Sequence, residues 1–377
     1  MFRIHNFNAG PAALPLEVLE TAKAELVDFR GTGMSIMEAS HRGKAYDAVH
    51  AEATSLYKEL LGVGDDYAVL LLQGGASQQF SMVPMNLLAE GEVADYTDSG
   101  SWASKAIKEA KKVGKVNVIA DCGKETPTRV PTSAELKHTP GAKYLHITSN
   151  ETISGAQWRE FPEAPEGTAL VADMSSDILS RPFDATKFGL IYAGAQKNLG
   201  PSGLTVVLIR KELAEGSVSR PVEQKDSAGR PTVPAELPTM LKYSTHLEND
   251  SLYNTPPTFA IYLFGLVLKW IKTRGKENLF AQNAAKAAAL YAAIDSSGGW
   301  YRGAAAVPFR SDMNVTWRLP TEELEAKFVA EAKKAGMEGL KGHRDVGGIR
   351  ASIYNAVPVK AVDDLIKFMR EFHRVNG

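Results

Sequence analysis

Short apolar segments alternate with longer amphipathic segments along the chain up to about Arg210. An uninterrupted apolar segment of this length is typical of a strand that is buried on both faces, as in a mainly parallel sheet. The pattern predicts seven strands, at residues 68–72, 93–96, 116–120, 143–147, 170–172, 190–193 and 204–209.

Amphipathic segments with helical periodicity lie between several of these strands, for example Gln78–Ala89 and Ser101–Val113. Alternation of strands and helices predicts an α/β fold of the doubly wound type, in which helices cover a mainly parallel, seven-stranded sheet. The connections between parallel strands are expected to be right-handed, because the strands themselves are twisted.

The pattern changes after Arg210. The segment Ser217–Pro238 is rich in proline, serine and charge, and is expected to be a long exposed connection. Beyond it, an apolar helix opens at Asn254–Thr258, where prolines suit the first turn, and ends at Gly275.

A smaller α+β domain follows this helix. It is expected to contain helices at 282–294, 322–335 and from 361, and strands at 314–319 and 348–353. The chain therefore divides into a large domain over residues 16–255 and a small domain over residues 256–377. The N-terminal segment 1–15 is expected to pack with the small domain.

Composition limits the possible partners. The formal net charge is -1, so the chain lacks the concentrated positive charge that nucleic acid or an anionic membrane requires. The most apolar stretch, Phe259–Ile271, is too short to span a bilayer and contains Lys269. The single cysteine, Cys122, excludes an intrachain disulfide, and no HExxH motif or cysteine pair indicates a metal site. The start shows no apolar core of signal-peptide length, so a cytoplasmic protein is expected. Since no metal-binding motif is present either, no metal is expected.

Lys197 follows the predicted strand 190–193, in a loop of small residues that runs to Gly203. Most lysines are solvated surface charges, and that is the alternative interpretation. A lysine at a strand end, however, lies where α/β proteins bind ligands, and small neighbours let a planar ligand approach. Partial burial would lower the pKa of the amine and favour the neutral form that a Schiff base needs.

Asp173 follows the predicted strand 170–172. It could cap a turn or a helix. If its strand is a parallel neighbour of the strand before Lys197, both side chains emerge at the same edge of the sheet. A carboxylate there would keep the nitrogen of a pyridine ring protonated, so that the ring withdraws electrons from the α-carbon of a substrate.

A glycine turn, Gly74-Gly75, connects strand 68–72 to a helix that starts near Ala76 and Ser77. Backbone N–H groups at a helix start can hold a phosphate, although paired glycines are also common in ordinary turns. Trp102 opens the helix after strand 93–96. Its ring could stack on a cofactor or could simply be partly buried.

Two His-Arg pairs, His41-Arg42 and His343-Arg344, stand out, and Arg350 follows the second pair in a glycine-rich segment. Guanidinium groups bind phosphate and carboxylate oxygens in a two-pronged geometry, and histidine adds a titratable donor. Solvated surface charge is the alternative for each of them.

Together these residues resemble the phosphoserine aminotransferase family, within the fold type I pyridoxal-phosphate enzymes. The resemblance runs nearly from end to end, through the blocks Asn6–Ala12, Ser40–Gly43, Gly74–Ser77, Ala195–Gly203, Asn254–Thr258, Lys341–Arg344 and Gly347–Asn355. The last three blocks are specific to this branch, whereas the glycine turn is not.

The resemblance implies how the cofactor is held. Lys197 would bind pyridoxal phosphate as a Schiff base, Asp173 would pair with the pyridine nitrogen, and Trp102 would stack on the ring. Thr152 would hydrogen-bond the ring hydroxyl. The phosphate contacts would be Ala76, Ser77 and Gln196, with Asn254 and Thr255 of a second subunit.

The resemblance also implies the substrates, L-glutamate and 3-phosphohydroxypyruvate. Their α-carboxylate would bind Arg350, and their distal anionic group would meet His41, Arg42, His343 and Arg344. The products would be O-phospho-L-serine and 2-oxoglutarate, in serine biosynthesis, and some bacterial members also act in pyridoxine biosynthesis. A homodimer with shared active sites is expected.

Two features depart from the family. Some members have an arginine where this chain has Ser77, and the Ser217–Pro238 connection is longer than usual. Three alternatives to this family are an alanine–glyoxylate type of aminotransferase, a cysteine desulfurase, and a protein that binds the vitamin without catalysis. Cys122 follows a predicted strand instead of lying in a mobile loop, which argues against a desulfurase.

Overall fold

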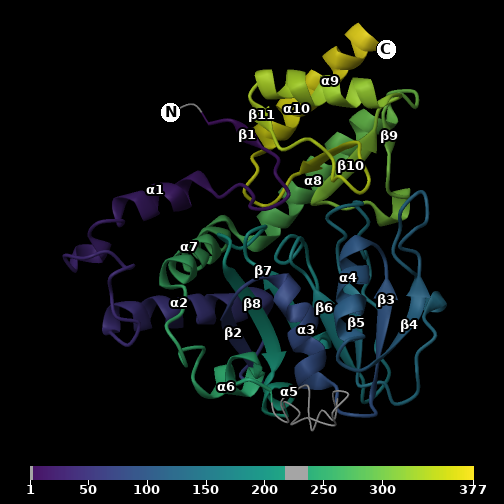
Figure 1. Cartoon of the computed structure of the whole chain (residues 1–377). Coiled ribbons are helices and arrows are strands. Elements are labelled where there is room, and N and C mark those ends of the chain that lie inside the picture. The colour runs from purple at the N-terminus through teal and green to yellow at the C-terminus, as the bar shows by residue number, and fades with distance from the viewer. Residues whose placement is uncertain (1–2, 217–236) are drawn as a thin grey trace, which may run out of the picture.

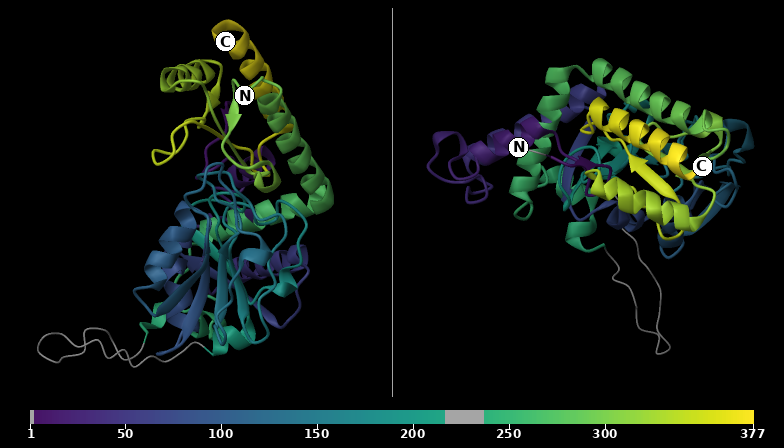
Figure 2. Two further views of the ribbon diagram at one scale, coloured as in Figure 1. Left: turned by 90° about the vertical axis from the view of Figure 1, so that its right-hand side faces the viewer. Right: turned by 90° about the horizontal axis from the view of Figure 1, so that it is seen from above.

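The computed structural model describes residues 3–216 and 237–377, which form a large body on one sheet and a smaller body beside it (Figures 1 and 2). All of the predicted connection Ser217–Pro238 except its last two residues lies outside the described residues. The chain's N-terminal segment and its C-terminal helix both belong to the smaller body (Figure 1).

The seven strands that the apolar pattern predicts form one sheet. They are β2 (Tyr67–Gln73), β3 (Val93–Asp98), β4 (Lys115–Asp121), β5 (Tyr144–Thr148), β6 (Ala169–Asp173), β7 (Leu190–Gly194) and β8 (Leu204–Arg210), in the order β2-β8-β7-β6-β5-β3-β4. Strand β8 is antiparallel to both of its neighbours, and the other pairs are parallel. The loop from β7 to β8 is too short for the crossover that a parallel neighbour requires.

Helices cover both faces of the sheet (Figure 1). Successive strand residues point to opposite faces, so Val69 and Leu71 lie in one core and Leu70 and Leu72 in the other. The first face is covered by α1 (Leu16–Ala24), α2 (Lys44–Leu61) and α7 (Thr258–Arg274). The second face is covered by α3 (Ala76–Leu87), α4 (Ser101–Ala110), α5 (Lys211–Glu215) and α6 (Tyr243–Glu248).

The smaller body has its own core. A three-stranded antiparallel sheet, with order β12-β10-β9, packs against three helices. Its elements are α8 (Lys276–Asp295), β9 (Arg302–Gly303), β10 (Asn314–Arg318), α9 (Glu322–Lys334), β12 (Ile349–Ser352) and α10 (Val359–Asn376). The N-terminal strand β1 (His5–Asn6) pairs in parallel with β11 (Met337–Glu338), and Phe7 is fully buried in this second core.

The apolar helix that the sequence predicts is α7, and it ends at Gly275, whose φ is 77°. The division at residue 256 assigns α7 to the small domain, whereas Ile261 and Phe264 contribute to the core of the large sheet. Helix α8 begins directly at Lys276, before the predicted start at residue 282. Short 3₁₀ turns lie at Phe29–Gly31, Ser133–Glu135, Ala185–Lys187, Thr239–Leu241 and Val307–Phe309.

Across residues 3–216 and 237–377, no helix combines the length and the apolar character that crossing a membrane would take. In the same described residues, no group of three or more histidine, cysteine or acidic side chains is arranged to hold a metal ion.

Candidate active site

Lys197 lies in the turn that follows β7, where its amine donates a 2.7 Å hydrogen bond to Oγ1 of Thr152. The N-terminal segment packs against this turn, since Ala12 N donates to Gln196 O. Gly10 has a φ of 147°, and a Cβ there would lie 3.3 Å from Cγ of Lys197. A glycine at this position therefore lets the N-terminal segment approach the lysine closely.

The surroundings of Lys197 favour the neutral amine. Burial is the largest influence and lowers the pKa of Lys197, and the guanidinium of Arg350 lowers it further. The carboxyl groups of Asp173 and Glu151 act in the opposite direction. Together these effects lower the pKa of Lys197 below its ordinary value, as a nucleophilic amine requires.

Asp173 is the last residue of β6, and β6 and β7 are parallel neighbours, as the sequence argument requires. Its side chain is buried, and Oδ1 accepts a 2.9 Å hydrogen bond from the backbone N–H of Ser175. Burial raises the pKa of Asp173, and the nearby Lys197 partly offsets that rise. Asp173 and Lys197 therefore emerge at the same edge of the sheet and interact electrostatically.

Trp102 faces the lysine from the start of α4. Nζ of Lys197 lies 5.3 Å from the centre of its ring, and Nζ of Lys105 lies 4.2 Å from it. The indole Nε1 is buried and has no hydrogen-bond partner. An aromatic face beside the amine and the carboxylate of Asp173 leaves a planar ring a place to stack.

The glycine turn leads into α3 as predicted, and Gly74 has a φ of 101°. Ala76 and Ser77 are the first two helical residues, so their backbone N–H groups have no acceptor within the helix. Ser77 is exposed. Free N–H groups at a helix start form a site for a phosphate.

Asn254 and Thr255 lie beside this turn in the same chain. Gln73 Nε2 donates a 2.9 Å hydrogen bond to Thr255 O, and Asn254 Nδ2 lies 3.5 Å from Gln73 Oε1. Their assignment to the phosphate site of a second subunit stays a prediction.

Arg350 comes to the site from β12 of the smaller body. Its Nη1 donates a 3.2 Å hydrogen bond to the backbone O of Thr152, the residue that also accepts from Lys197. Its Nε is buried without a partner, and burial lowers the pKa of Arg350. A half-buried guanidinium with an unpaired N–H is suited to bind an anionic ligand.

The two His-Arg pairs are placed differently. Arg42 is exposed, and the side chain of Arg344 is 90% exposed, with Nε 3.6 Å from Oδ1 of Asp345. His343 is closer to the site, because Arg350 and Lys105 contribute to lowering its pKa, after burial as the main cause. A single chain therefore does not bring Arg42 or Arg344 against Lys197.

Glu151, which the sequence analysis did not single out, is fully buried behind Trp102. Its carboxyl accepts hydrogen bonds from the backbone N–H groups of Trp102, at 3.1 Å, and Ala103, at 3.0 Å. A lone acidic residue next to Thr152 gives no sequence signal of this contact, which depends on the packing of α4.

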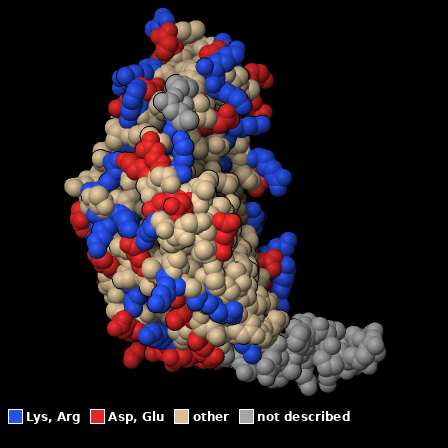
Figure 3. Space-filling view, turned by 90° about the vertical axis from the view of Figure 1, so that its left-hand side faces the viewer, with Lys and Arg blue, Asp and Glu red and all other residues tan. Residues whose placement is uncertain are grey.

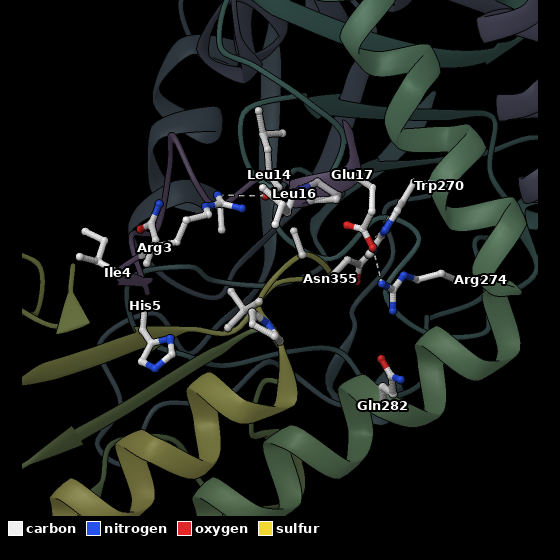
Figure 4. A pocket seen from close by; sticks show the side chains of 16 residues that line it. Arg3, Ile4, His5, Leu14, Leu16, Glu17, Trp270, Arg274, Gln282 and Asn355 are labelled. Carbon is white, nitrogen blue, oxygen red and sulfur yellow. Dashed lines mark hydrogen bonds and ion pairs between the residues drawn. The ribbon is translucent and has the colours of Figure 1, made fainter. Parts of the chain in front are cut away.

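A separate groove of about 520 Å³ lies between the N-terminal segment and the ends of α7 and α8 (Figure 4). None of the residues discussed above as the site lines it. Its charged groups Arg274, Glu17 and His5 are paired, because Arg274 bonds Glu17 at 2.6 Å and His5 bonds Asp364 at 2.9 Å, whereas Arg3 donates to the backbone O of Leu14 at 3.4 Å.

The fit to pyridoxal phosphate is good. The site offers a buried amine, a carboxylate beside it, an aromatic face, and a helix start with free N–H groups, on the carboxyl side of a mainly parallel sheet. These are the groups that a phosphorylated pyridine aldehyde requires. The fold and the site define a pyridoxal-phosphate enzyme of the aminotransferase type.

Comparisons with known proteins agree. The family model described as aminotransferase class-V matches residues 4–365. A phosphoserine aminotransferase of Geobacillus kaustophilus is 55% identical over 375 residues, which cover 99% of each chain. The solved phosphoserine aminotransferase of Bacillus circulans subsp. alkalophilus is 54% identical, with a TM-score of 0.92 over 100% of this chain and 99% of that chain.

A more distant solved structure, pyridoxal-phosphate-bound phosphoserine aminotransferase from Trichomonas vaginalis, is 39% identical. Its TM-score is 0.88 over 98% of this chain and 100% of that chain. The chain belongs to the phosphoserine aminotransferase family, and its cofactor is pyridoxal phosphate.

Proposed function

We propose that the chain transfers the amino group of L-glutamate to 3-phosphohydroxypyruvate and yields O-phospho-L-serine and 2-oxoglutarate, in serine biosynthesis. The observation that carries the proposal is the convergence of Lys197, Thr152 and Arg350. The amine and the guanidinium both bond Thr152, so a reacting amine and a carboxylate receptor lie side by side. Use of the related pyridoxine-pathway substrate stays a prediction.

Residues of the large body would hold the cofactor. Lys197 would bind it through the amine, and Asp173 would keep its ring nitrogen protonated. Trp102 would stack on the ring, and Thr152 Oγ1 would hydrogen-bond the ring hydroxyl. When bound, pyridoxal phosphate supplies an electron sink that stabilises negative charge at the substrate α-carbon. The phosphate contacts would be Ala76, Ser77 and Gln196, joined by Asn254 and Thr255 of a second subunit.

Lys197 would also move a proton. A neutral amine can accept the proton from the substrate α-carbon and return it, and the lowered pKa of Lys197 favours that neutral form. Arg350 would fix the α-carboxylate through the N–H groups that the protein leaves free, which aligns the α-carbon with Lys197. The N-terminal segment at Gly10 lies close to the lysine and limits the access of water to it.

The distal anion of each substrate would be bound across a homodimer. His343 and Arg344 would contribute from one chain, and His41 and Arg42 from its partner, because Arg42 has no contact with its own Lys197. The segment between α1 and α2 extends from the body (Figure 1), and exposes Leu26, Val27, Met34 and Met37, with Val27 81% exposed. Four exposed apolar side chains in one short segment indicate an interaction surface.

The distribution of charge on the side of the molecule that carries the segment between α1 and α2 also favours an interaction surface there. In Figure 3, uncharged side chains make up most of the area right of the centre of this face, with single charged side chains among them. A second copy of the chain would cover the area and would bring in Arg42 by symmetry. A cytoplasmic location, consistent with the single reduced Cys122, is part of the proposal.

One experiment tests the reaction and its rivals. The purified chain with bound pyridoxal phosphate is mixed with glutamate, and the absorbance of the cofactor is followed. Conversion to the aminated cofactor, and its reversal by 3-phosphohydroxypyruvate but not by glyoxylate, is the expected result. Reversal by glyoxylate alone would favour an alanine–glyoxylate type, and an unchanged spectrum would favour a protein that binds the vitamin without catalysis.

A further inference from the structure

A buried acid behind the cofactor site has no ion-pair partner among the described residues. The Glu151 side chain has 0% exposure, and its carboxyl is bonded only by neutral donors. Oε2 accepts from Trp102 N, and Oε1 accepts from Ala103 N, with Ser99 Oγ at 3.5 Å. An acidic group buried in this way has a high energetic cost, so a well-formed arrangement must hold it.

The backbone around Glu151 is arranged to admit the carboxyl. Gly100, which precedes α4, has a φ of 155°, and a Cβ there would lie 2.7 Å from Cδ of Glu151. Any larger residue would displace the carboxyl from the helix start. The main chain of Glu151 is itself fixed, because its N–H donates to Ala156 O and its O accepts from Gly155 N.

The starts of α3 and α4 therefore differ. The backbone N–H groups of Trp102 and Ala103, in the first turn of α4, are taken by the carboxyl of Glu151. Those of Ala76 and Ser77, at the start of α3, have no acceptor within the helix. These N–H groups of α4 therefore cannot bind the cofactor phosphate. The first turn of α4 instead carries the Trp102 ring toward Lys197.

We propose that Glu151 is a positioning residue that fixes the indole of Trp102 against the cofactor ring by holding the first turn of α4. The proposal rests on the proposed function, because it assumes that Trp102 stacks on the cofactor. Glu151 itself touches neither cofactor nor substrate, and it acts through Trp102. A carboxyl suits this position because it presents two acceptor oxygens to two N–H donors.

Glu151→Gln is the sharpest variant. The side chain keeps its shape, but the amide has one acceptor oxygen, so its NH₂ group faces an N–H donor of the helix. A buried donor left without its acceptor weakens the arrangement, and we expect pyridoxal phosphate to bind the apoprotein about tenfold more weakly or worse. Glu151→Asp is measured in parallel because it keeps the charge but is too short to reach both donors.

A double-mutant cycle identifies the route of the effect. The dissociation constant of pyridoxal phosphate is measured for the wild type, Glu151→Gln, Trp102→Ala and the double variant. In the Trp102→Ala background, Glu151→Gln should change the constant by less than about twofold. The circular dichroism of the bound cofactor should fall in Glu151→Gln and Trp102→Ala alike. Equal losses in both Trp102 backgrounds would overturn the proposal, as would wild-type binding in both Glu151 variants.

Asp95→Asn is the matched control. Asp95 is a buried acid on β3 that accepts a 2.8 Å hydrogen bond from the backbone N–H of Thr139, away from Trp102. We expect it to lose stability but to keep the wild-type binding constant and dichroism. Transamination by the wild type is assayed separately. A wild type that binds the cofactor but does not transaminate would contradict the proposed function alone.

Discussion

The amine of Lys197 and the guanidinium of Arg350 meet on one residue, because Thr152 accepts the lysine through its hydroxyl and the arginine through its backbone carbonyl. The lysine comes from the large sheet, and the arginine comes from β12 of the smaller body. The two bodies therefore share a contact at the reacting centre, and a shift of one against the other changes the distance between amine and carboxylate receptor.

Lys197→Ala should remove both the covalently bound cofactor and turnover. The expected loss of turnover is at least about 1,000-fold, because the variant lacks the group that moves the α-proton. Absorbance of the purified variant and the rate with glutamate measure the two effects. The exposed Lys211→Ala serves as the control and should keep both. Normal transamination by Lys197→Ala would contradict the assignment.

Asp173→Asn should retain cofactor and lose most of the rate. The amide cannot stabilise a protonated ring nitrogen, and loss of one partner of a buried charge pair typically costs about 2–5 kcal/mol, or roughly 30-fold or more in rate. The rate of amino transfer and the amount of cofactor are measured together. If the rate is unchanged, Asp173 is only a turn cap, which its bond from Ser175 N would then explain.

The free energy of unfolding of the apoprotein should depend on pH through the ionisation of Glu151. Burial is the main cause that raises the pKa of Glu151, from 4.5 to about 7, and Asp173 and Asp98 add to it. A raised acid pKa gives stability that is fully present below pH 4.5 and is lost as pH rises to about 7. Glu151→Gln cannot titrate, so the free energy of unfolding of the wild type, taken relative to that of the variant, should fall over that range. Urea unfolding at several pH values measures it, and a constant difference would show that Glu151 does not titrate there.

Much of the fold could be predicted from the sequence because most strands of the large sheet are buried on both faces and form apolar segments, with the mostly exposed edge strand β4 as the exception. The start of α8 could not, because Lys276 and Glu277 begin it with polar residues that resemble a loop. Gly275 ends one helix and begins the next, and the two roles give the same sequence signal.

The site was partly predictable for a physical reason. Lys197 and Asp173 follow strands that are parallel neighbours, so their place at one edge of the sheet is determined by local features. The contact of Glu151 with Trp102 depends on the pairing of β3 with β5, which strand and helix alternation does not determine. Arg42 and Arg344 are exposed in the single chain, and their place in the site stays a prediction that rests on the proposed dimer.

The shared active site can be tested by mixing inactive chains. Lys197→Ala supplies an intact Arg42, and Arg42→Ala supplies an intact Lys197. If Arg42 acts across the interface, a mixed dimer has one complete site, and activity should return toward about a quarter of the wild-type value, from random pairing of equal amounts of the two chains. Verified subunit exchange without recovery would place Arg42 in its own chain's site or outside any site.

Substitutions of Arg344 and Arg350 should affect the binding of different ends of the substrates. Both substrates carry an α-carboxylate, whereas glutamate ends in a carboxylate and 3-phosphohydroxypyruvate ends in a more highly charged phosphate. Loss of an ionic contact typically costs about 2–5 kcal/mol when the contact is buried in the complex. Arg350→Ala should therefore lower kcat/KM for both substrates about equally, because Arg350 is half-buried and shares Thr152 as an acceptor with Lys197. Arg344→Ala should lower kcat/KM more for the phosphorylated substrate, because a guanidinium fork attracts the doubly charged phosphate more strongly. Lys341→Ala, which is exposed in the same loop, is the control and should alter neither value by more than about twofold. Equal losses for both substrates in Arg344→Ala would assign phosphate selectivity to His41, Arg42 or His343 instead.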